Sequence, residues 1–269
     1  MVADNLRKLL QELPSGVKLV AVSKFHPVER LMEAYDAGQR IFAESRPQEL
    51  AAKVPLMPAD VEWHFIGHLQ TNKLKLVLPY VSLVQSVDSL HLLEAIDRWG
   101  EANGKVIDIL LELHLGSEET KQGFSEEEIF HILLGGTIPS ENCATLGTAT
   151  PKIDRFSGTP GTALRGAHLW EGRRSRSDRR FSEGMVPPYQ NIRFRGLMGM
   201  ATNTEDAEVI RTEFARIQAL YGLIREKCPQ LADTFTELSI GMSDDWHLAV
   251  EHGSTMVRIG TAIFGPREY

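Results

Sequence analysis

Eight short apolar runs alternate with helix-like segments along this chain, and this alternation is the strongest constraint on its fold. Runs of this kind, rich in β-branched residues, are typical of strands buried on both faces of a parallel sheet. They cover residues 17–23, 40–43, 62–66, 83–86, 106–114, 192–198, 235–240 and 256–259. This strand count, with helices between the strands over about 250 residues, is that of a TIM-type barrel. We therefore predict an α/β fold, a (β/α)8 TIM-type barrel that forms a single domain.

Residues 135–190 interrupt the alternation with a segment that lacks both helical and strand periodicity. Gly, Pro, Ser and Thr dominate it, and an arginine cluster follows at 173–180. A structureless stretch of this length is unusual inside a compact domain. We predict a long irregular insertion within a barrel domain that spans 1–269. A disordered loop is favoured, and a surface that contacts RNA or an acidic partner or a reading-frame error are the alternatives.

A doubly wound open sheet is the main competitor for the fold. The first strand is not followed by the Gly-x-Gly-x-x-Gly signature that usually marks a dinucleotide-binding sheet. The helix-like segments begin on capping residues, which include Ser89 (or Asp88), Ser125 with Glu128 in a capping box, and Thr204. The strand count then favours the barrel.

The first strand-like run, VKLVAVSK, ends in Lys24. The C-terminal ends of strands are where barrels and open α/β sheets assemble their sites. An amine held against an apolar floor has a lowered pKa and forms a Schiff base with an aldehyde. The segment alone favours a solvated lysine at a strand end, and the other end of the chain changes this interpretation.

Two glycine-and-hydroxyl segments near the C-terminus each follow an apolar run: residues 241–243, which end in Ser243, and Gly260-Thr261. Glycine lets the backbone approach an anion closely, and N–H groups with hydroxyls then hold a phosphate. Arg258 lies two residues before Gly260, and an arginine inside an apolar run needs a partner. An ion pair with a carboxylate at the edge of the core is the alternative role.

Composition and charge exclude several classes of protein. The chain has 269 residues and a net charge of −7, which argues against nucleic acid or an acidic membrane as the main partner. Its two cysteines, Cys143 and Cys228, form no metal-binding motif, and no apolar run approaches the length of a membrane span. The first residues predict an amphipathic helix, not a signal peptide. We expect a cytoplasmic protein.

Five separated motifs occur in a fixed order. They are LVAVSK at 19–24, WHFIGHLQTNK at 63–73, EETKQGF at 118–124, GLMGMAT at 196–202, and LSIGMSDD followed by GSTMVRIGTAIFG at 238–265. Together they resemble the pyridoxal phosphate (PLP) homeostasis protein family, which consists of single-domain, fold-type-III PLP-binding barrels. The resemblance runs from about residue 5 to 134 and from 191 to 267. Residues 135–190 are not matched.

The resemblance implies that Lys24 carries PLP through a Schiff base. The family's barrel is similar to that of alanine racemase, in which an arginine two residues before a glycine faces the pyridine nitrogen, and Arg258 matches that position. Gly260 and Thr261 match the phosphate-binding backbone, and Ser243 matches a further phosphate donor. Because a guanidinium does not give up its proton, it would keep the ring nitrogen unprotonated and weaken PLP as an electron sink.

Other polar residues carry weaker signals. His64 and His68 lie four apart at a strand end without a metal-site motif, so we expect them to form hydrogen bonds around the barrel mouth. Asp244 and Asp245 are expected to cap a helix, with magnesium ligation as the alternative. Where the family commonly has Phe-Gly-Glu-Asn, the chain ends the motif in Ser45, which leaves open whether this position hydrogen-bonds the cofactor.

The leading function is therefore a PLP-binding protein for intracellular PLP homeostasis, which buffers or delivers the cofactor with little or no turnover. Its expected partners are PLP and apo PLP-dependent enzymes, and we expect a monomer. The alternative is a PLP-dependent amino-acid racemase. Such racemases take a second acid–base tyrosine from a C-terminal β domain, which we do not expect here because the chain ends at Tyr269. An interaction module that acts through the arginine-rich insertion would instead show salt-sensitive binding independent of Lys24.

Overall fold

The computed structural model describes residues 1–116, 122–134 and 189–266. In these ranges, eight strands close into a barrel in which each strand pairs with its neighbours in sequence order. The strands are β1 (Lys18–Val22), β2 (Ile41–Glu44), β3 (Glu62–Phe65), β4 (Leu83–Val87), β5 (Ile107–Leu113), β6 (Ile192–Gly199), β7 (Glu237–Ser239) and β8 (Met256–Ile259). The predicted TIM-type barrel is confirmed.

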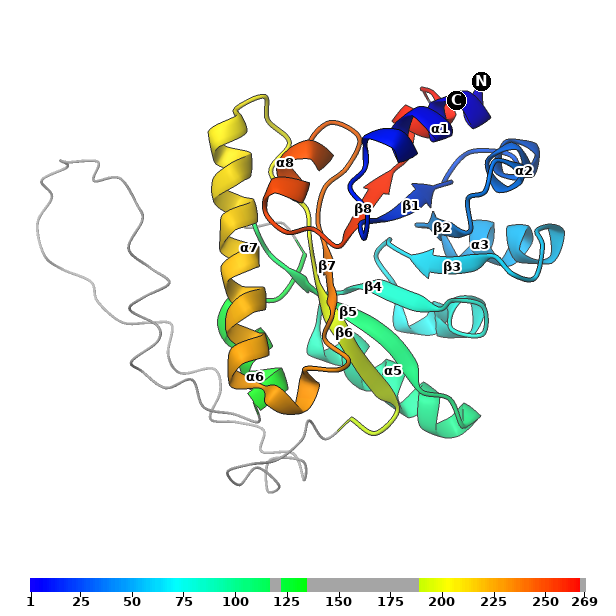
Figure 1. The fold of residues 1–269 in the computed structure, drawn as a ribbon. Helices are drawn as coiled ribbons and strands as arrows, with labels where there is room; N and C mark the ends of the chain where they lie inside the picture. Colours follow the sequence, from blue (N-terminus) through cyan, green and yellow to red (C-terminus); the bar gives the residue numbers. More distant parts are fainter. Residues whose placement is uncertain (117–121, 135–188, 267–269) are drawn as a thin grey trace, which may run out of the picture. The chain divides into compact units, whose positions relative to one another are not determined.

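The barrel closes where β8 pairs in parallel with β1. In this register Lys18 lies opposite Met256 and Val20 lies opposite Arg258. Figure 1 shows the two strands side by side, with β1 in blue and β8 in red. Because the strands are parallel, their C-terminal ends share one face of the barrel. The segments that follow β1 and β8 therefore meet at that face.

Helices connect the strands, and α2, α3, α5, α7 and α8 lie around the outside of them (Figure 1). The described helices are α1 (Val2–Glu12), α2 (Val28–Asp36), α3 (Pro47–Lys53), α4 (Leu74–Val77), α5 (Leu90–Asn103), α6 (Glu126–Leu134), α7 (Ala207–Lys227), α8 (Trp246–Glu251) and α9 (Thr261–Phe264). Short 3₁₀ turns occur at Val54–Leu56, Thr71–Lys73 and Pro229–Leu231. None of the helices in the described part of the chain is both long and apolar enough to cross a membrane.

Two of the predicted helix caps are confirmed. Ser89 caps α5, and its side chain accepts a hydrogen bond from the backbone N–H of Leu92. In the capping box, Ser125 and Glu128 each accept a hydrogen bond from the other's backbone N–H, at 2.8 and 3.2 Å. The prediction for α7 is wrong. Its cap is Asp206, which accepts from the N–H of Glu208 at 2.9 Å, because the chain makes one more turn after Thr204 before the helix begins.

The middle of the barrel is filled with apolar side chains. A cluster of buried residues from six strands fills this region: Val20, Ala43, Leu83, Leu110, Met198 and Met256. Interdigitated layers of this kind make a TIM-type barrel a packed core and not a pore. In the described part of the chain, a cavity lies toward each end of the strands, and these two cavities differ in their lining.

Contacts group the chain into two compact units, of which the first comprises Met1–Ile129 and Pro188–Tyr269 and contains the barrel strands. The second unit is Phe130–Pro187. Residues 135–188 lie outside the described residues, so the predicted irregular insertion at 135–190 stays a prediction. The same holds for the arginine cluster within it.

Close packing of β6 against β7 generates a prediction for stability. A Cβ atom on Gly196 would lie 1.7 Å from the backbone oxygen of Glu237 on β7, so Gly196→Ala forces the two strands apart. We expect Gly196→Ala to lower the free energy of unfolding by more than about 2 kcal/mol, measured by urea denaturation.

Gly222 in α7 provides the matched control, because a Cβ added there meets nothing within 4 Å. Gly222→Ala should raise stability by up to about 1 kcal/mol through its better helix propensity. Equal effects of the two substitutions would contradict the packing described for β6 and β7.

Candidate functional site

A cavity of about 230 Å³ lies at the C-terminal ends of the strands. The residues predicted from the sequence to form a site all line it: Lys24, Ser243, Arg258, Gly260 and Thr261. Val22, Ile66 and Met198 give the cavity apolar walls. The fold therefore brings together groups that are up to 237 positions apart in the sequence, as seen for Lys24 and Thr261.

Lys24 follows the end of β1, and the backbone turns sharply directly after it. Phe25 has a φ of +67°, which is rare for a residue other than glycine. Its N–H donates to the Glu49 carboxylate on α3 at 2.9 Å, and the Arg46 guanidinium lies 4.3 Å from the centre of its ring. These contacts stabilise an unfavourable backbone conformation at Phe25, and the chain therefore turns away from the direction of β1 directly after Lys24.

A buried ion pair supports the strand end beside Lys24. The Lys53 ammonium donates to Glu44 at 2.7 Å and to the backbone oxygen of Ser23 at 2.9 Å, and the Ser23 hydroxyl donates to the same Glu44 oxygen at 2.7 Å. Burial raises the pKa of Glu44, and the Lys53 ammonium and the Ser23 hydroxyl reduce this increase. Removing one partner of such a pair is costly, because the other charge stays buried. The pair thus fixes β2 against the segment that carries Lys24.

Arg258 is 4% exposed, and three hydrogen bonds fix its guanidinium. It donates to the backbone oxygen of Ser239 at 2.7 Å, to the Ser239 hydroxyl at 2.6 Å and to the backbone oxygen of Gly199 at 2.9 Å. A guanidinium has five N–H donors, so two have no hydrogen-bond partner among the described residues. Burial lowers the pKa of Arg258 to about 10, which leaves it charged at neutral pH. Arg258 also lines the cavity.

The remaining predicted residues bring backbone and hydroxyl groups to one side of the cavity. Gly260 packs closely against β1, since a Cβ there would lie 3.1 Å from the backbone oxygen of Val22. Thr261 begins α9 directly after it. The N–H of Arg258 donates to the backbone oxygen of Gly241 at 3.0 Å, and this bond holds the loop that carries Ser243 beside β8. Glycines and hydroxyls arranged in this way suit a phosphate.

The structure corrects some expectations for the neighbouring residues. His64 does not lie at the mouth that Lys24 faces, because it points into the barrel and lines the cavity at the N-terminal ends of the strands. His68 does hydrogen-bond near the C-terminal ends, to Asp88 at 2.9 Å. Asp245 occupies the N-cap position of α8, but its side chain makes no capping hydrogen bond to the helix and instead accepts from the N–H of Met242 in the preceding loop. Asp244 instead lines the cavity.

Sequence reasoning missed two residues of this region. His26 lines the cavity and stacks on Phe264, with ring centres 4.9 Å apart. Glu112 is 6% exposed near the end of β5, where it interacts electrostatically with Arg258. A glutamate inside the apolar run ILLEL was a usable signal for Glu112, because carboxylates are rarely buried without a partner. His26 had only its position two residues after Lys24.

Comparison with known proteins places the chain among relatives of similar length. It is 32% identical over 261 residues to the pyridoxal phosphate homeostasis protein of Vibrio alginolyticus, which covers 95% of this chain and 89% of that protein. It is also 32% identical over 270 residues to the protein of that name from Schizosaccharomyces pombe, with 98% and 91% covered. The chain belongs to the pyridoxal phosphate homeostasis protein family. Residues 1–135 also match the family described as alanine racemase, N-terminal domain.

Solved structures agree with this family. PipY of Synechococcus elongatus PCC7942, solved with PLP bound, is 30% identical and has a TM-score of 0.72, with 98% of this chain and 100% of that chain covered. Alanine racemase from E. faecalis is 16% identical with a TM-score of 0.61, and 98% of this chain covers 57% of that chain. The second likeness shows a shared barrel fold only.

The electrostatics of Glu112 generate a prediction for the pH dependence of stability. Burial, with Asp88 adding to the effect, raises the pKa of Glu112 from 4.5 to about 7, and Arg258 and His68 oppose the shift. The folded state thus binds the Glu112 proton more tightly than the unfolded chain does. The contribution of this proton to folding stability is complete below the pKa of Glu112 in the unfolded chain, and it is lost as the pH rises through about 7. Glu112→Gln removes this dependence. When the pH is raised from 4.5 to 8, we expect the free energy of unfolding of the variant to rise by about 3 kcal/mol relative to that of the unsubstituted chain.

The measurement is urea unfolding of the variant and the unsubstituted chain at both pH values. The difference between their free energies of unfolding is taken at each pH, and the two differences are compared. Glu29→Gln, which alters an exposed side chain on α2, is the matched control and should show no such change. A stability difference that is the same at both pH values would contradict a raised pKa of Glu112.

Proposed function

We propose that the cavity at the C-terminal ends of the strands binds PLP and that the protein buffers or delivers this cofactor. The observation that carries the proposal is the convergence of Lys24 and the two unpartnered donors of Arg258 on one cavity. A lysine amine binds an aldehyde covalently, and a guanidinium donor suits the unprotonated nitrogen of a pyridine ring. PLP carries both of these groups, and relatives across the full length of the chain bear its name.

The residues present fit the rest of the cofactor. Ser243, Gly260 and Thr261 would hold the phosphate, because the glycine backbone approaches closely where a Cβ would crowd β1. Val22 and Ile66 would contact the ring with apolar surface. The cavity thus offers a covalent anchor, a phosphate site and a ring-nitrogen donor in one place.

Arg258 favours storage of the cofactor over turnover. PLP supplies an electron sink to enzymes that bind it, and the strength of this sink depends on a proton at the ring nitrogen. Arg258 stays charged at neutral pH and donates its N–H, so it keeps that nitrogen unprotonated. Its fixation by Ser239 and Gly199 prevents it from turning away. We therefore propose a role in intracellular PLP homeostasis, as a cytoplasmic monomer that passes PLP to apo PLP-dependent enzymes.

The covalent anchor is tested by replacing Lys24. The unsubstituted chain incubated with PLP should show the visible absorbance band of lysine-bound PLP, and borohydride should abolish the band and fix the cofactor on the peptide that contains Lys24. Lys24→Ala should lose the band while the far-ultraviolet circular dichroism stays unchanged. Lys8→Ala on exposed α1 is the control and should keep the band. Mass spectrometry that places reduced PLP mainly on another lysine would overturn the assignment.

The proposed low turnover is tested separately. The PLP-loaded protein, incubated with L-alanine in deuterated water, should exchange the α-hydrogen slowly or not at all, because Arg258 leaves the cofactor a weak electron sink. Nuclear magnetic resonance of the alanine α-proton and chiral chromatography measure exchange and racemisation. Racemisation on the order of 1 to 1,000 per second, as in typical enzymes, would establish the racemase alternative instead.

A further inference from the structure

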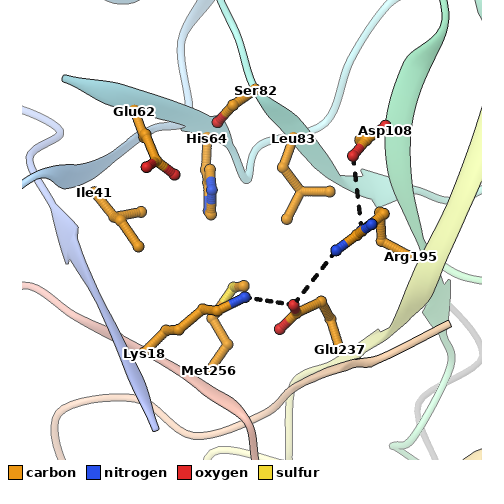
Figure 2. Close-up of a pocket in the computed structure, with 10 residues that line it drawn as sticks. All are labelled: Lys18, Ile41, Glu62, His64, Ser82, Leu83, Asp108, Arg195, Glu237 and Met256. Carbon is orange, nitrogen blue, oxygen red and sulfur yellow. Dashed lines mark hydrogen bonds and ion pairs between the residues drawn. The ribbon is translucent and has the colours of Figure 1, made fainter. Parts of the chain in front are cut away.

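A second cavity lies at the N-terminal ends of the strands, at the opposite end from Lys24. It has a volume of about 370 Å³, which falls in the range of small-molecule sites. Figure 2 shows its lining, which comes from the first residues of strands all around the barrel. Titratable groups dominate it, whereas the N-terminal end of a TIM-type barrel normally serves stability. What these groups leave unsatisfied indicates what the cavity can bind.

Most of the charges around this cavity satisfy one another. Lys18 donates to Glu237, and Thr255 donates to the other oxygen of Glu237 at 3.0 Å. Arg195 lies 3.9 Å from Glu237 and 3.7 Å from Asp108 (Figure 2). The lining thus holds two cations and two anions in pairs, and Arg193, which lies outside the lining, also pairs with Asp108 at 3.1 Å.

His64 presents an unpaired donor to the cavity. The side chain is 4% exposed and points from β3 into the cavity (Figure 2). Its Nδ1 contacts the Gln85 amide nitrogen at 2.8 Å, and no described residue forms a hydrogen bond with its Nε2. Burial, with Lys18 adding to the effect, lowers the pKa of His64 to about 3, so the ring is neutral at physiological pH.

A hydrogen-bond relay through the barrel determines where the ring proton lies. Arg258 can only donate, so the Ser239 hydroxyl accepts from it at 2.6 Å and donates onward to the Gln85 carbonyl at 2.7 Å. The Gln85 amide nitrogen then donates to Nδ1 of His64 and to the Met256 sulfur. Nδ1 is therefore an acceptor, and the neutral ring carries its proton on Nε2. This N–H faces the cavity.

Glu62 presents an unpaired anion next to His64. It is the first residue of β3, it is exposed, and it lies beside His64 at the cavity in Figure 2. No described residue forms an ion pair or hydrogen bond with its carboxylate. The cavity therefore has one unmatched donor and one unmatched negative charge. A lone anion would leave the Glu62 carboxylate unpaired beside it, so a ligand that also carries a positive charge fits the lining better.

We propose that this cavity binds a small zwitterion such as an α-amino acid. The ligand carboxylate accepts from the Nε2–H of His64 and lies near Lys18, and its ammonium group pairs with Glu62. Ile41, Leu83 and Met256 line the same cavity and would contact a short aliphatic side chain. Binding at this site does not require PLP.

The test uses the full chain freed of PLP with hydroxylamine, so that an added amine cannot react with the cofactor. L-Leucine is the probe, and calorimetry should show saturable binding to one site with a Kd on the order of 1 mM or tighter. Two analogues define the ligand class: 4-methylpentanoate lacks the ammonium group, and 3-methylbutylamine lacks the carboxylate. Each should bind at least about tenfold more weakly than leucine, because one of the two unmatched groups stays unpaired.

Matched variants locate the site. Glu62→Gln alters an exposed side chain without a partner to lose, so the fold should survive, and leucine binding should weaken about tenfold or more. The control is Glu29→Gln on α2, which follows the C-terminal end of β1 and so lies away from this cavity. This variant should bind leucine like the unsubstituted chain. The ¹⁵N chemical shifts of the His64 ring should show the Nε2–H tautomer and should change on addition of leucine. Absence of saturable binding, equal binding of leucine and 4-methylpentanoate, or no effect of Glu62→Gln would each overturn the proposal.

Discussion

The parallel pairing of β1 with β8 is the constraint on which the rest of the structure depends. It joins the first strand of the barrel to the last, with Val20 opposite Arg258. This register brings the segment after β1, which carries Lys24, next to the turn at Gly260. Without it, the proposed covalent anchor, Lys24, and the proposed phosphate-binding backbone at Gly260 would lie apart in the fold. The close approach of Gly260 to Val22 shows how little space this pairing leaves.

Buried charge inside the barrel follows a consistent physical logic. Arg258 and Glu44 are both removed from water, and each is held by several hydrogen bonds. Lone buried charges are costly, whereas charges fixed by hydrogen bonds hold a defined geometry. In this protein they fix the position of the strand ends at the C-terminal face. The apolar cluster from six strands packs in the same core.

The sequence was sufficient to predict the barrel, its strands and five of the residues that line the C-terminal cavity. This succeeded because each of those residues lies at a strand end, and parallel strands place such ends on one face. The cap of α7 at Asp206 was missed, because Thr204 and Asp206 are both good caps and only the extra turn distinguishes them. Local sequence gives no such information.

The relay and the N-terminal cavity could not be predicted for a different reason. Gln85, Ser239 and His64 lie on three strands, and each is an ordinary polar residue within an apolar run. Their contact depends on the register of these strands, of which β7 is far from β3 and β4 in the sequence, and on which face of each strand points inward. A shift of one residue in any strand would turn its side chain outward. The three-dimensional structure was therefore needed to find this cavity.

The relay also means that the two ends of the barrel cannot be altered independently. All hydrogen bonds of the relay run in the same direction, because Arg258 can donate but cannot accept. Each later group in the relay therefore has a fixed role as donor or acceptor. A neutral acceptor at position 258 would allow Ser239 to point the other way, Gln85 to rotate and His64 to move its proton to Nδ1. The cavity at the far end would then offer a lone pair where it now offers an N–H. Arg258, which we propose to face the cofactor nitrogen, thus sets the hydrogen-bonding character of a cavity on the other side of the core.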